Sequence, residues 1–305
     1  MIYRRITGKQ ILDPVADIGT IRALKQAAIE QRRLLLELGH RGPIRLHYGA
    51  MMSCIDILTL LYLRWLNVDP HNPGWPDRDR FVLSKGHAAP ALYAALWIRG
   101  FFPMEAFDSF RRLGSLLQGH PDRNKTPGVD CTTGSLGQGF PVACGMALGA
   151  GIDQASYRVY ALISDGECNE GSVWEAALIA ANLKINRLTV LLDWNKKSSY
   201  GPMEGRNDIQ PLADKWRAFG WAVLECDGHD FVSLSQALSA AEQVRDRPAV
   251  LLCHTIKGRG IPHAETQPTR SNFSLTEEQF QEALAHLIDE EQSLQIMVTP
   301  LGSAF

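Results

Sequence analysis

The sequence has no long apolar run, no excess of basic residues and no closely spaced pair of cysteines. No apolar run reaches the ~18 residues that a membrane-spanning helix needs. The polar residues that follow Met1 do not resemble the apolar core of a signal peptide. A formal charge of −2 and a pI near 6.5 leave no basic footprint for nucleic acid. The sequence therefore predicts neither a membrane protein nor a nucleic-acid-binding protein.

Cysteines are few and scattered, and there is no internal repeat or low-complexity segment. The 6 cysteines show no Cys-x-x-Cys spacing, which argues against a zinc site. Several lie in apolar runs, so we expect buried thiols in a reducing compartment rather than disulfides. With 305 residues and 45% hydrophobic content, the chain can build one large domain or two small ones. These features together predict a cytoplasmic enzyme.

A strand, a helix and a second strand form the centre of the sequence. The apolar runs Val159–Ile163 and Leu188–Leu192 have the composition of buried strands, and the residues Val173–Leu183 have that of a helix. Such a βαβ crossover is right-handed and its strands are parallel, so both strands end at one edge of a sheet. Open parallel sheets bind ligands at that edge. We therefore expect Asp165 and Asn195, which follow the two strands, to lie close together.

A carboxylate and an amide oxygen form a sparse, hard-oxygen ligand set. Such a set suits Mg²⁺, which completes its octahedron with water and ligand phosphates. Gly166 would allow a phosphate to approach the backbone, and the N–H groups of the following helix favour an anion. These residues indicate a magnesium–diphosphate site. The plainer alternative is an Asp-Gly turn and an Asn loop cap.

The whole stretch resembles the thiamine-diphosphate (ThDP) motif of transketolases. The matching features are Asp165-Gly-Glu, Glu170-Gly171, a helix, a strand and Asn195-Lys. The motif usually opens with Gly, where this chain has Ser164. The resemblance implies that Asp165, Asn195 and the backbone carbonyl of Lys197 hold Mg²⁺, for which Ca²⁺ or Mn²⁺ can substitute. It also implies that Gly166 lies against the diphosphate, and that Glu170 lies at a subunit interface and links two sites.

Two histidines lie in further strings that resemble transketolases. In Asp79–Ala88 the resemblance implies that His87 reaches the cofactor diphosphate and the substrate. In Gln118–Pro121 it implies that His120 contacts hydroxyl groups of the donor sugar. Both would hydrogen-bond reacting oxygens and move protons, because imidazole titrates near neutral pH.

A third histidine is assigned by its distance from Ile55–Leu58. Counting back from that run places His47 on the family's first active-site histidine. Its neighbours depart from the family pattern, since Gly-His-Pro-Gly-Gly is replaced by Leu46–Ala50. His40 remains the alternative for this role. Elsewhere, His71 and His229 are interpreted as ordinary solvated or capping loop residues.

The segment Thr132–Gly139 is a glycine-rich loop before a helix of small residues, Val142–Gly151. Alone, Gly-x-x-Gly-x-Gly is a weak signal that a structural turn explains equally well. In this position it resembles the transketolase loop that contacts the aminopyrimidine ring. The contact residues implied are Gly134, Ser135 and Leu136.

The remaining elements continue an α/β alternation. They are a helix at 20–38, an apolar helix at 52–66, a strand at 80–83, helices at 88–99 and 103–113, strands at 221–226 and 248–256, and a helix at 234–244. Ser274–Glu277 fits an N-cap box that opens a last helix. We predict a three-layer α/β fold with a mostly parallel central sheet and helices on both faces. Within this single ThDP-binding domain (1–305), we expect a helical part at about 1–125, a core at 126–270 and a C-terminal helix at 274–291.

One departure concerns the donor substrate. The loop Lys257–Pro262 resembles the family's Lys-Gly-Lys-Gly, and transketolases usually carry a His-Gly about a dozen residues later. Here the matching positions are Ser271 and Asn272. His263 lies nearby at a different offset and is not assigned.

The resemblance covers about residues 18–290 and only one half of a full-length transketolase. It implies that a partner chain supplies the pyrimidine-binding domain and the catalytic glutamate. The hypothesis is one half of a split transketolase, inactive alone and assembled as an α₂β₂ tetramer. It would transfer a two-carbon ketol unit from a ketose phosphate to an aldose.

Three alternatives stay open. The chain could belong to another ThDP enzyme, such as a 1-deoxyxylulose-phosphate synthase or an α-keto acid dehydrogenase. It could be a non-catalytic ThDP-binding paralogue. It could also be a dinucleotide-binding domain, although its glycine-rich loop follows no clear strand.

Overall fold

A parallel sheet of five strands lies at the centre of the molecule. The computed structural model describes residues 17–41, 45–198, 201–205, 207–266 and 272–296. The strand order is β1-β2-β3-β7-β6, and each neighbouring pair is parallel. The strands are β1 (Arg80–Leu83), β2 (Val159–Ser164), β3 (Leu188–Trp194), β6 (Ala222–Asp227) and β7 (Ala249–His254). All four parallel pairings bring carboxyl ends of strands to the same edge.

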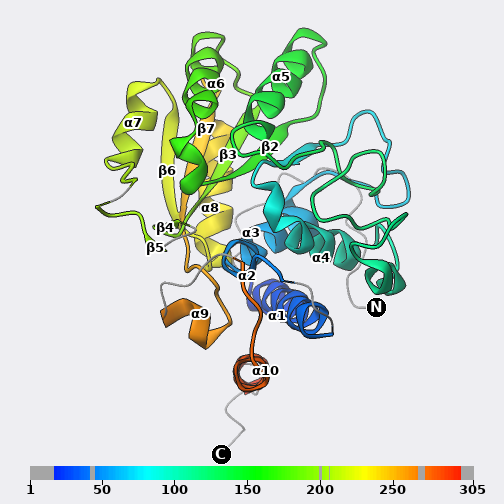
Figure 1. Ribbon diagram of the computed structural model, residues 1–305. Helices are drawn as coiled ribbons and strands as arrows, with labels where there is room; N and C mark the ends of the chain where they lie inside the picture. The colour runs from blue at the N-terminus through cyan, green and yellow to red at the C-terminus, as the bar shows by residue number, and fades with distance from the viewer. Residues whose placement is uncertain (1–16, 42–44, 199–200, 206, 267–271, 297–305) are drawn as a thin grey trace, which may run out of the picture.

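Helices cover both faces of this sheet (Figure 1). Successive side chains of a strand point to opposite faces, so Leu162 of β2 lies in one apolar cluster and Ile163 in the other. The first cluster includes α1 (Ile18–His40), α3 (Ile55–Leu60), α4 (Ala89–Arg99), α8 (Phe231–Gln243) and α10 (Glu277–Ile296). The second includes α5 (Gly139–Ile152), α6 (Gly171–Asn182) and α7 (Leu212–Ala218). The predicted three-layer α/β fold is confirmed.

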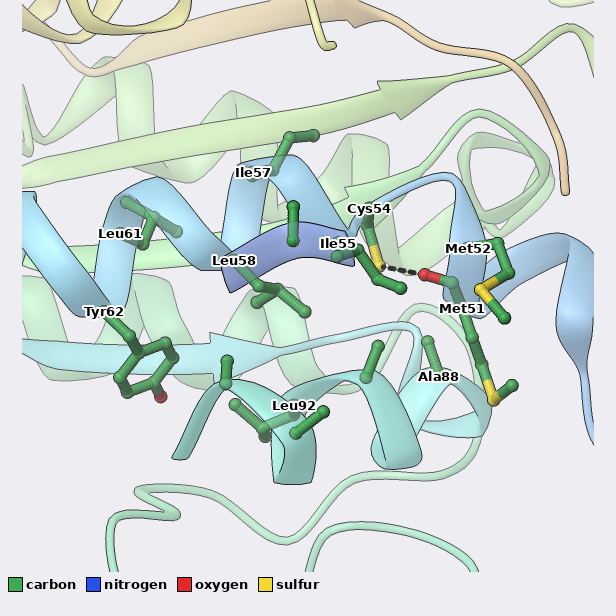
Figure 2. Packing of buried hydrophobic residues seen from close by; sticks show 14 of the residues in the cluster. Met51, Met52, Cys54, Ile55, Ile57, Leu58, Leu61, Tyr62, Ala88 and Leu92 are labelled. Atoms are coloured by element: carbon green, nitrogen blue, oxygen red, sulfur yellow. Dashed lines mark hydrogen bonds between the residues drawn. The ribbon is translucent and has the colours of Figure 1, made fainter. Parts of the chain in front are cut away.

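The expected helix at 52–66 begins three residues later than predicted and consists of α3 followed directly by a π-helical turn at Leu61–Trp65. A separate short helix, α2 (Tyr48–Met52), precedes it, with a break at residues 53–54. At the break, the Sγ of Cys54 donates to the carbonyl of Met51 at 3.4 Å, as Figure 2 shows among the packed apolar side chains. Ser53, also at the break, donates its hydroxyl to Asp193 of β3. Apolar spacing alone predicted one helix, because the competing bond from Ser53 is tertiary.

Two further segments differ from expectation. The helix expected at 103–113 is a 3-10 turn, Met104–Ser109, after which Arg111 adopts a positive φ of 61°. The chain after β3 forms a short hairpin of β4 (Lys197–Ser198) and β5 (Gly201–Pro202) that the sequence did not indicate.

The prediction for the cysteines is confirmed. All six thiols are buried and unbridged. None of the described helices combines the length and apolar character needed to cross a bilayer.

The N-cap of α10 lies two residues later than predicted. The amide N–H of Gln279 donates to Thr276 Oγ1 at 3.3 Å, and that of Thr276 donates to Gln279 Oε1 at 3.0 Å. This reciprocal pair is a capping box. Ser274 does not take this role because α10 begins at Glu277, so that Thr276 is the residue directly before the helix.

We predict that Thr276→Ala lowers the free energy of unfolding by about 1 kcal/mol, because the substitution removes the side-chain acceptor of the cap. Urea titration followed by far-UV circular dichroism measures this difference. Ser274→Ala is the matched control, and we expect its effect to stay below about 0.5 kcal/mol. Equal losses from both substitutions would contradict the shifted cap.

Candidate functional site

Asp165 and Asn195 meet at the carboxyl edge of β2 and β3, as predicted. Ser164 pairs with Asp193 in the sheet, and the N–H of Asp165 donates to the carbonyl of Asp193 at 3.1 Å. The two Asp165 carboxylate oxygens accept the N–H groups of Gly166 at 2.7 Å and of Lys196 at 2.6 Å. Asn195 directly follows β3, and its Oδ1 accepts the N–H of Lys197 at 3.1 Å, so the two residues stand at adjacent strand ends.

The Asp165 carboxyl group has the properties of a cation ligand. Its residue is 1% exposed. Burial, followed by the nearby Asp193 carboxylate, raises its pKa to about 7. A cation bound here would offset both effects and hold the group ionised. Among the described residues, no group of three or more His, Cys, Asp or Glu side chains is arranged to hold a metal. One carboxylate beside an amide oxygen is a donor set that suits an ion with few protein ligands, such as Mg²⁺.

A buried ion pair, which the sequence analysis missed, lies behind Asp165. The ammonium of Lys85 donates to the carboxylate of Asp193, and both side chains are 0% exposed. Burial alone would raise the pKa of Asp193, but Lys85 and the hydroxyls of Ser53 and Thr255 lower it. Lys85 also donates to the carbonyl of Ala50 at 2.8 Å. The pair joins four segments, and only its place beside His87 could have drawn attention to Lys85.

Glu167 is a second residue that the sequence analysis left without a role. It is 0% exposed, and burial raises its pKa. Its carboxylate accepts the hydroxyl of Ser84 and the N–H of Gly137 at 2.8 Å. Glu167 thereby links three segments: the one that carries His87, the glycine-rich loop, and its own segment after Asp165. Its presence in the Asp-Gly-Glu string was the available signal.

The structure brings His47 and His87 together. Their ring centroids are 5.1 Å apart. Burial, followed by the charge of Lys85, lowers the pKa of His87 to about 3. Burial and then Arg111 lower the pKa of His47, whose Nδ1 is buried and has no hydrogen-bond partner among the described residues. An unpartnered buried nitrogen costs free energy, so this atom is available to a ligand or to water.

His120 packs against the glycine-rich loop at a more exposed position. A Cβ added to Gly134 would lie 3.6 Å from the His120 ring, so loop and ring are in contact. Burial and then Arg111 lower the pKa of His120. Gly86 approaches the same loop so closely that a Cβ there would lie 2.9 Å from the nitrogen of Gly134. The predicted histidines and this loop thus surround one region.

The remaining residues of the glycine-rich loop and Glu170 lie next to the region that the histidines surround. Ser135 is exposed and Leu136 is half-buried. Gly137 has a φ of +76°, and a Cβ there would lie 2.7 Å from the Cβ of Glu170. Glu170 is exposed at the start of α6. Its carboxylate therefore faces outward rather than into the core.

Lys257 is a third residue without an assigned role in the sequence analysis. Its ammonium donates to the carbonyls of Ser198 and, at 3.4 Å, of Lys197. Burial lowers its pKa to about 8, against the opposing charges of Asp165 and Asp193. Its stem lies so close to Gly49 that a Cβ there would be 2.6 Å away. A cation thus stands beside the carbonyl expected to bind metal.

Several histidines lie outside this region. His40 stacks on Phe280 with centroids 3.9 Å apart. His263 lies on the short helix α9 (Pro262–Thr266). His71 is exposed, as expected. Ser271 lies outside the described residues, and Asn272 is exposed.

The interpretation of His229 as an ordinary loop residue is wrong. Its ring is 13% exposed, and its Nδ1 lies 2.7 Å from the Asp56 carboxylate. The sequence could not show this contact, because the two residues are 173 positions apart.

The comparisons with known proteins agree with this geometry. Residues 18–297 match the family "Transketolase, thiamine diphosphate binding domain". The chain therefore belongs to the transketolase family, within its ThDP-binding domain.

Some similar proteins have the size of this chain. The 6-deoxy-6-sulfo-D-fructose transketolase subunit SqwG of Clostridium sp. (strain MSTE9) is 44% identical over 86% of this chain and 94% of that protein. An apulose-4-phosphate transketolase subunit from Actinobacillus succinogenes is 39% identical over 88% of this chain and 96% of its own length.

Others are about twice as long. Transketolase-like protein 2 of Homo sapiens is 38% identical over 83% of this chain but only 40% of its own length. The transketolase structure from Campylobacter jejuni superposes with a TM-score of 0.77 and 28% identity, over 90% of this chain and 48% of that one. The chain spans about half the length of such transketolases.

The low pKa of His87 predicts a pH dependence of stability. The unfolded imidazole titrates near 6.5 and the folded one near 3, so below pH 6.5 the unfolded state binds more protons. We expect the free energy of unfolding to fall by about 2 kcal/mol between pH 7.5 and pH 5 from this group alone. Urea titrations at a series of pH values measure it.

His87→Gln should remove this part of the pH dependence, whereas the control His71→Gln should keep it. An unchanged pH profile in His87→Gln would show that His87 is not held neutral by the fold.

Proposed function

We propose that this chain is the diphosphate-binding subunit of a two-chain transketolase, which transfers a two-carbon ketol unit from a ketose phosphate to an aldose. The observation that carries the proposal is the convergence of Asp165, Asn195, His87 and the glycine-rich loop at one sheet edge. The similarity to subunit-sized transketolase chains supports the same conclusion.

ThDP with Mg²⁺ is the proposed cofactor pair. Asp165, Asn195 and the carbonyl of Lys197 would hold the metal, and Ca²⁺ or Mn²⁺ could replace it. Gly166 would lie against the diphosphate, at the start of the 3-10 turn Gly166–Asn169. When bound, the cofactor supplies the carbanion chemistry of ketol transfer. The buried carboxylate with its raised pKa supports this assignment.

The proposed roles of the histidines follow from their protonation states. Burial keeps His87 neutral, and a neutral imidazole both donates and accepts a hydrogen bond. His87 and His47 would therefore orient reacting oxygens and exchange protons with them, whereas the more exposed His120 would contact donor hydroxyls. Gly134, Ser135 and Leu136 would contact the aminopyrimidine ring.

The proposed partner is the other half of a transketolase, which would bring the pyrimidine-binding domain and the catalytic glutamate. Large apolar side chains on α5 and α6 are exposed in this chain, including Ile152 at 73% and Ile179 at 54%. Such a surface suits a protein interface. Glu170, exposed at the start of α6, would link two sites in a cytoplasmic α₂β₂ assembly.

A sulfonated ketose is a second candidate donor beside the ketose phosphates, because the similar SqwG chain is named for one. A sulfonate and a phosphate are both terminal anions. We propose 6-deoxy-6-sulfo-D-fructose as the alternative donor.

The proposed function is tested with the complex captured from native lysate in the presence of ThDP and Mg²⁺. The complex is offered fructose 6-phosphate, xylulose 5-phosphate or 6-deoxy-6-sulfo-D-fructose together with an aldose phosphate, and the products are identified by mass. Ketol transfer from one of these donors is expected. Turnover of a 2-keto acid instead, or ThDP binding without turnover, would overturn the transketolase proposal.

We predict that Asp165→Ala weakens Mg²⁺-dependent ThDP binding by about 100-fold or more, because it removes the only carboxylate proposed for the metal. Isothermal titration of the complex with ThDP, at fixed Mg²⁺, measures the loss. Asp153→Ala, at an exposed position after α5, is the matched control and should bind normally. Unchanged affinity in Asp165→Ala would sink the metal assignment.

A further inference from the structure

His229 accepts a backbone hydrogen bond from the loop that carries Lys257. The residue follows β6, and its Nε2 accepts the N–H of Ile256 at 2.8 Å. A backbone N–H can only donate, so Nε2 carries no proton and Nδ1 must carry it. Nδ1 then donates to Asp56 at 2.7 Å. The two contacts define one neutral tautomer.

Asp56 is itself held by a second buried group. Arg32 donates to its two oxygens at 3.0 and 2.6 Å, and the two residues are 4% and 5% exposed. The Nε of Arg32 donates to the carbonyl of Arg259 at 3.2 Å. The triad of Arg32, Asp56 and His229 therefore binds the backbone of this loop at both ends.

The loop needs such anchors. Gly258 and Gly260 adopt φ values of +79° and +88°, and glycine loses more conformational freedom on ordering than any other residue. A cavity of about 370 Å³ opens against Arg32, Asp56, His229 and Arg259. Apolar packing does not hold the loop on the side of this cavity, and the hydrogen bonds from His229 and Arg32 hold it there instead. On the other side, the loop directs Lys257 at the carbonyls of Lys197 and Ser198.

We propose that His229 is a positioning residue, which, oriented by Asp56 and Arg32, holds the loop at 256–260 so that the Lys257 ammonium stays on the carbonyls of Lys197 and Ser198, beside the proposed metal and diphosphate site. The proposal rests on the proposed function for the diphosphate, but the placement of the loop can be tested without it. A purely space-filling role for His229 is the competing explanation.

Two substitutions separate the two hydrogen bonds of His229. His229→Gln places an amide oxygen near the position of Nε2 and keeps an acceptor for the N–H of Ile256. His229→Asn keeps a donor near Asp56 but loses that acceptor. Exposed His71→Gln is the control for loss of a histidine.

Amide hydrogen exchange of the full chain is measured over residues 254–260. We expect exchange in His229→Asn to be about 10-fold faster or more, because one hydrogen bond is lost. His229→Gln and His71→Gln should exchange as the wild type does. Equal exchange in the Asn and Gln variants would overturn the proposal.

The affinity of the partner complex for ThDP with Mg²⁺ forms a second arm. We expect Lys257→Met and His229→Asn each to weaken binding about 10-fold, and the double variant to be no weaker than either. Additive losses would show that His229 does not act through Lys257. If the wild type fails to bind ThDP, the proposed function fails, and the exchange arm still decides the placement of the loop.

A third measurement uses the wild-type chain alone, so it does not depend on whether a variant folds. Nitrogen-15 NMR of histidine-labelled wild-type chain should show the proton of His229 on Nδ1. A proton on Nε2 would overturn the proposal.

Discussion

The buried ion pair between Lys85 and Asp193 is the interaction on which the arrangement at the sheet edge depends. Two carboxylates, Asp165 and Asp193, stand at adjacent strand ends, and both could not be buried and ionised without positive charge nearby. Lys85 neutralises one of them within the fold. The second is left with a raised pKa, and it is the one that a metal ion can stabilise. Charge balance thus separates a structural carboxylate from the one proposed to bind a metal.

The same pair links the loops that carry the site residues to one another. Lys85 and Asp193 join the α2 break, the β1 loop and the ends of β3 and β7. Glu167 adds the glycine-rich loop to this group through the N–H of Gly137. Buried hydrogen bonds to charged groups are strong and directional. Each loop is therefore held by polar contacts with another loop, while the apolar clusters hold the helices.

The long-range contacts were the part that sequence could not predict. Apolar alternation predicted the five strands and most helices, since these patterns are local. It failed at the α2–α3 break, where Ser53 bonds to a distant strand, and at His229, whose partner Asp56 is far away in the chain. In each case a tertiary contact outweighed a local preference.

By itself, the sequence determined the α/β fold, the edge where Asp165 and Asn195 meet, and the resemblance to transketolases. Parallel strands have only one carboxyl edge, so local patterns were sufficient for these. Only the tertiary structure decided which charges are neutralised, which histidines are held neutral and which loops support Lys257. These depend on burial and on partners brought together by folding, because the cost of an unpaired charge arises only once water is excluded.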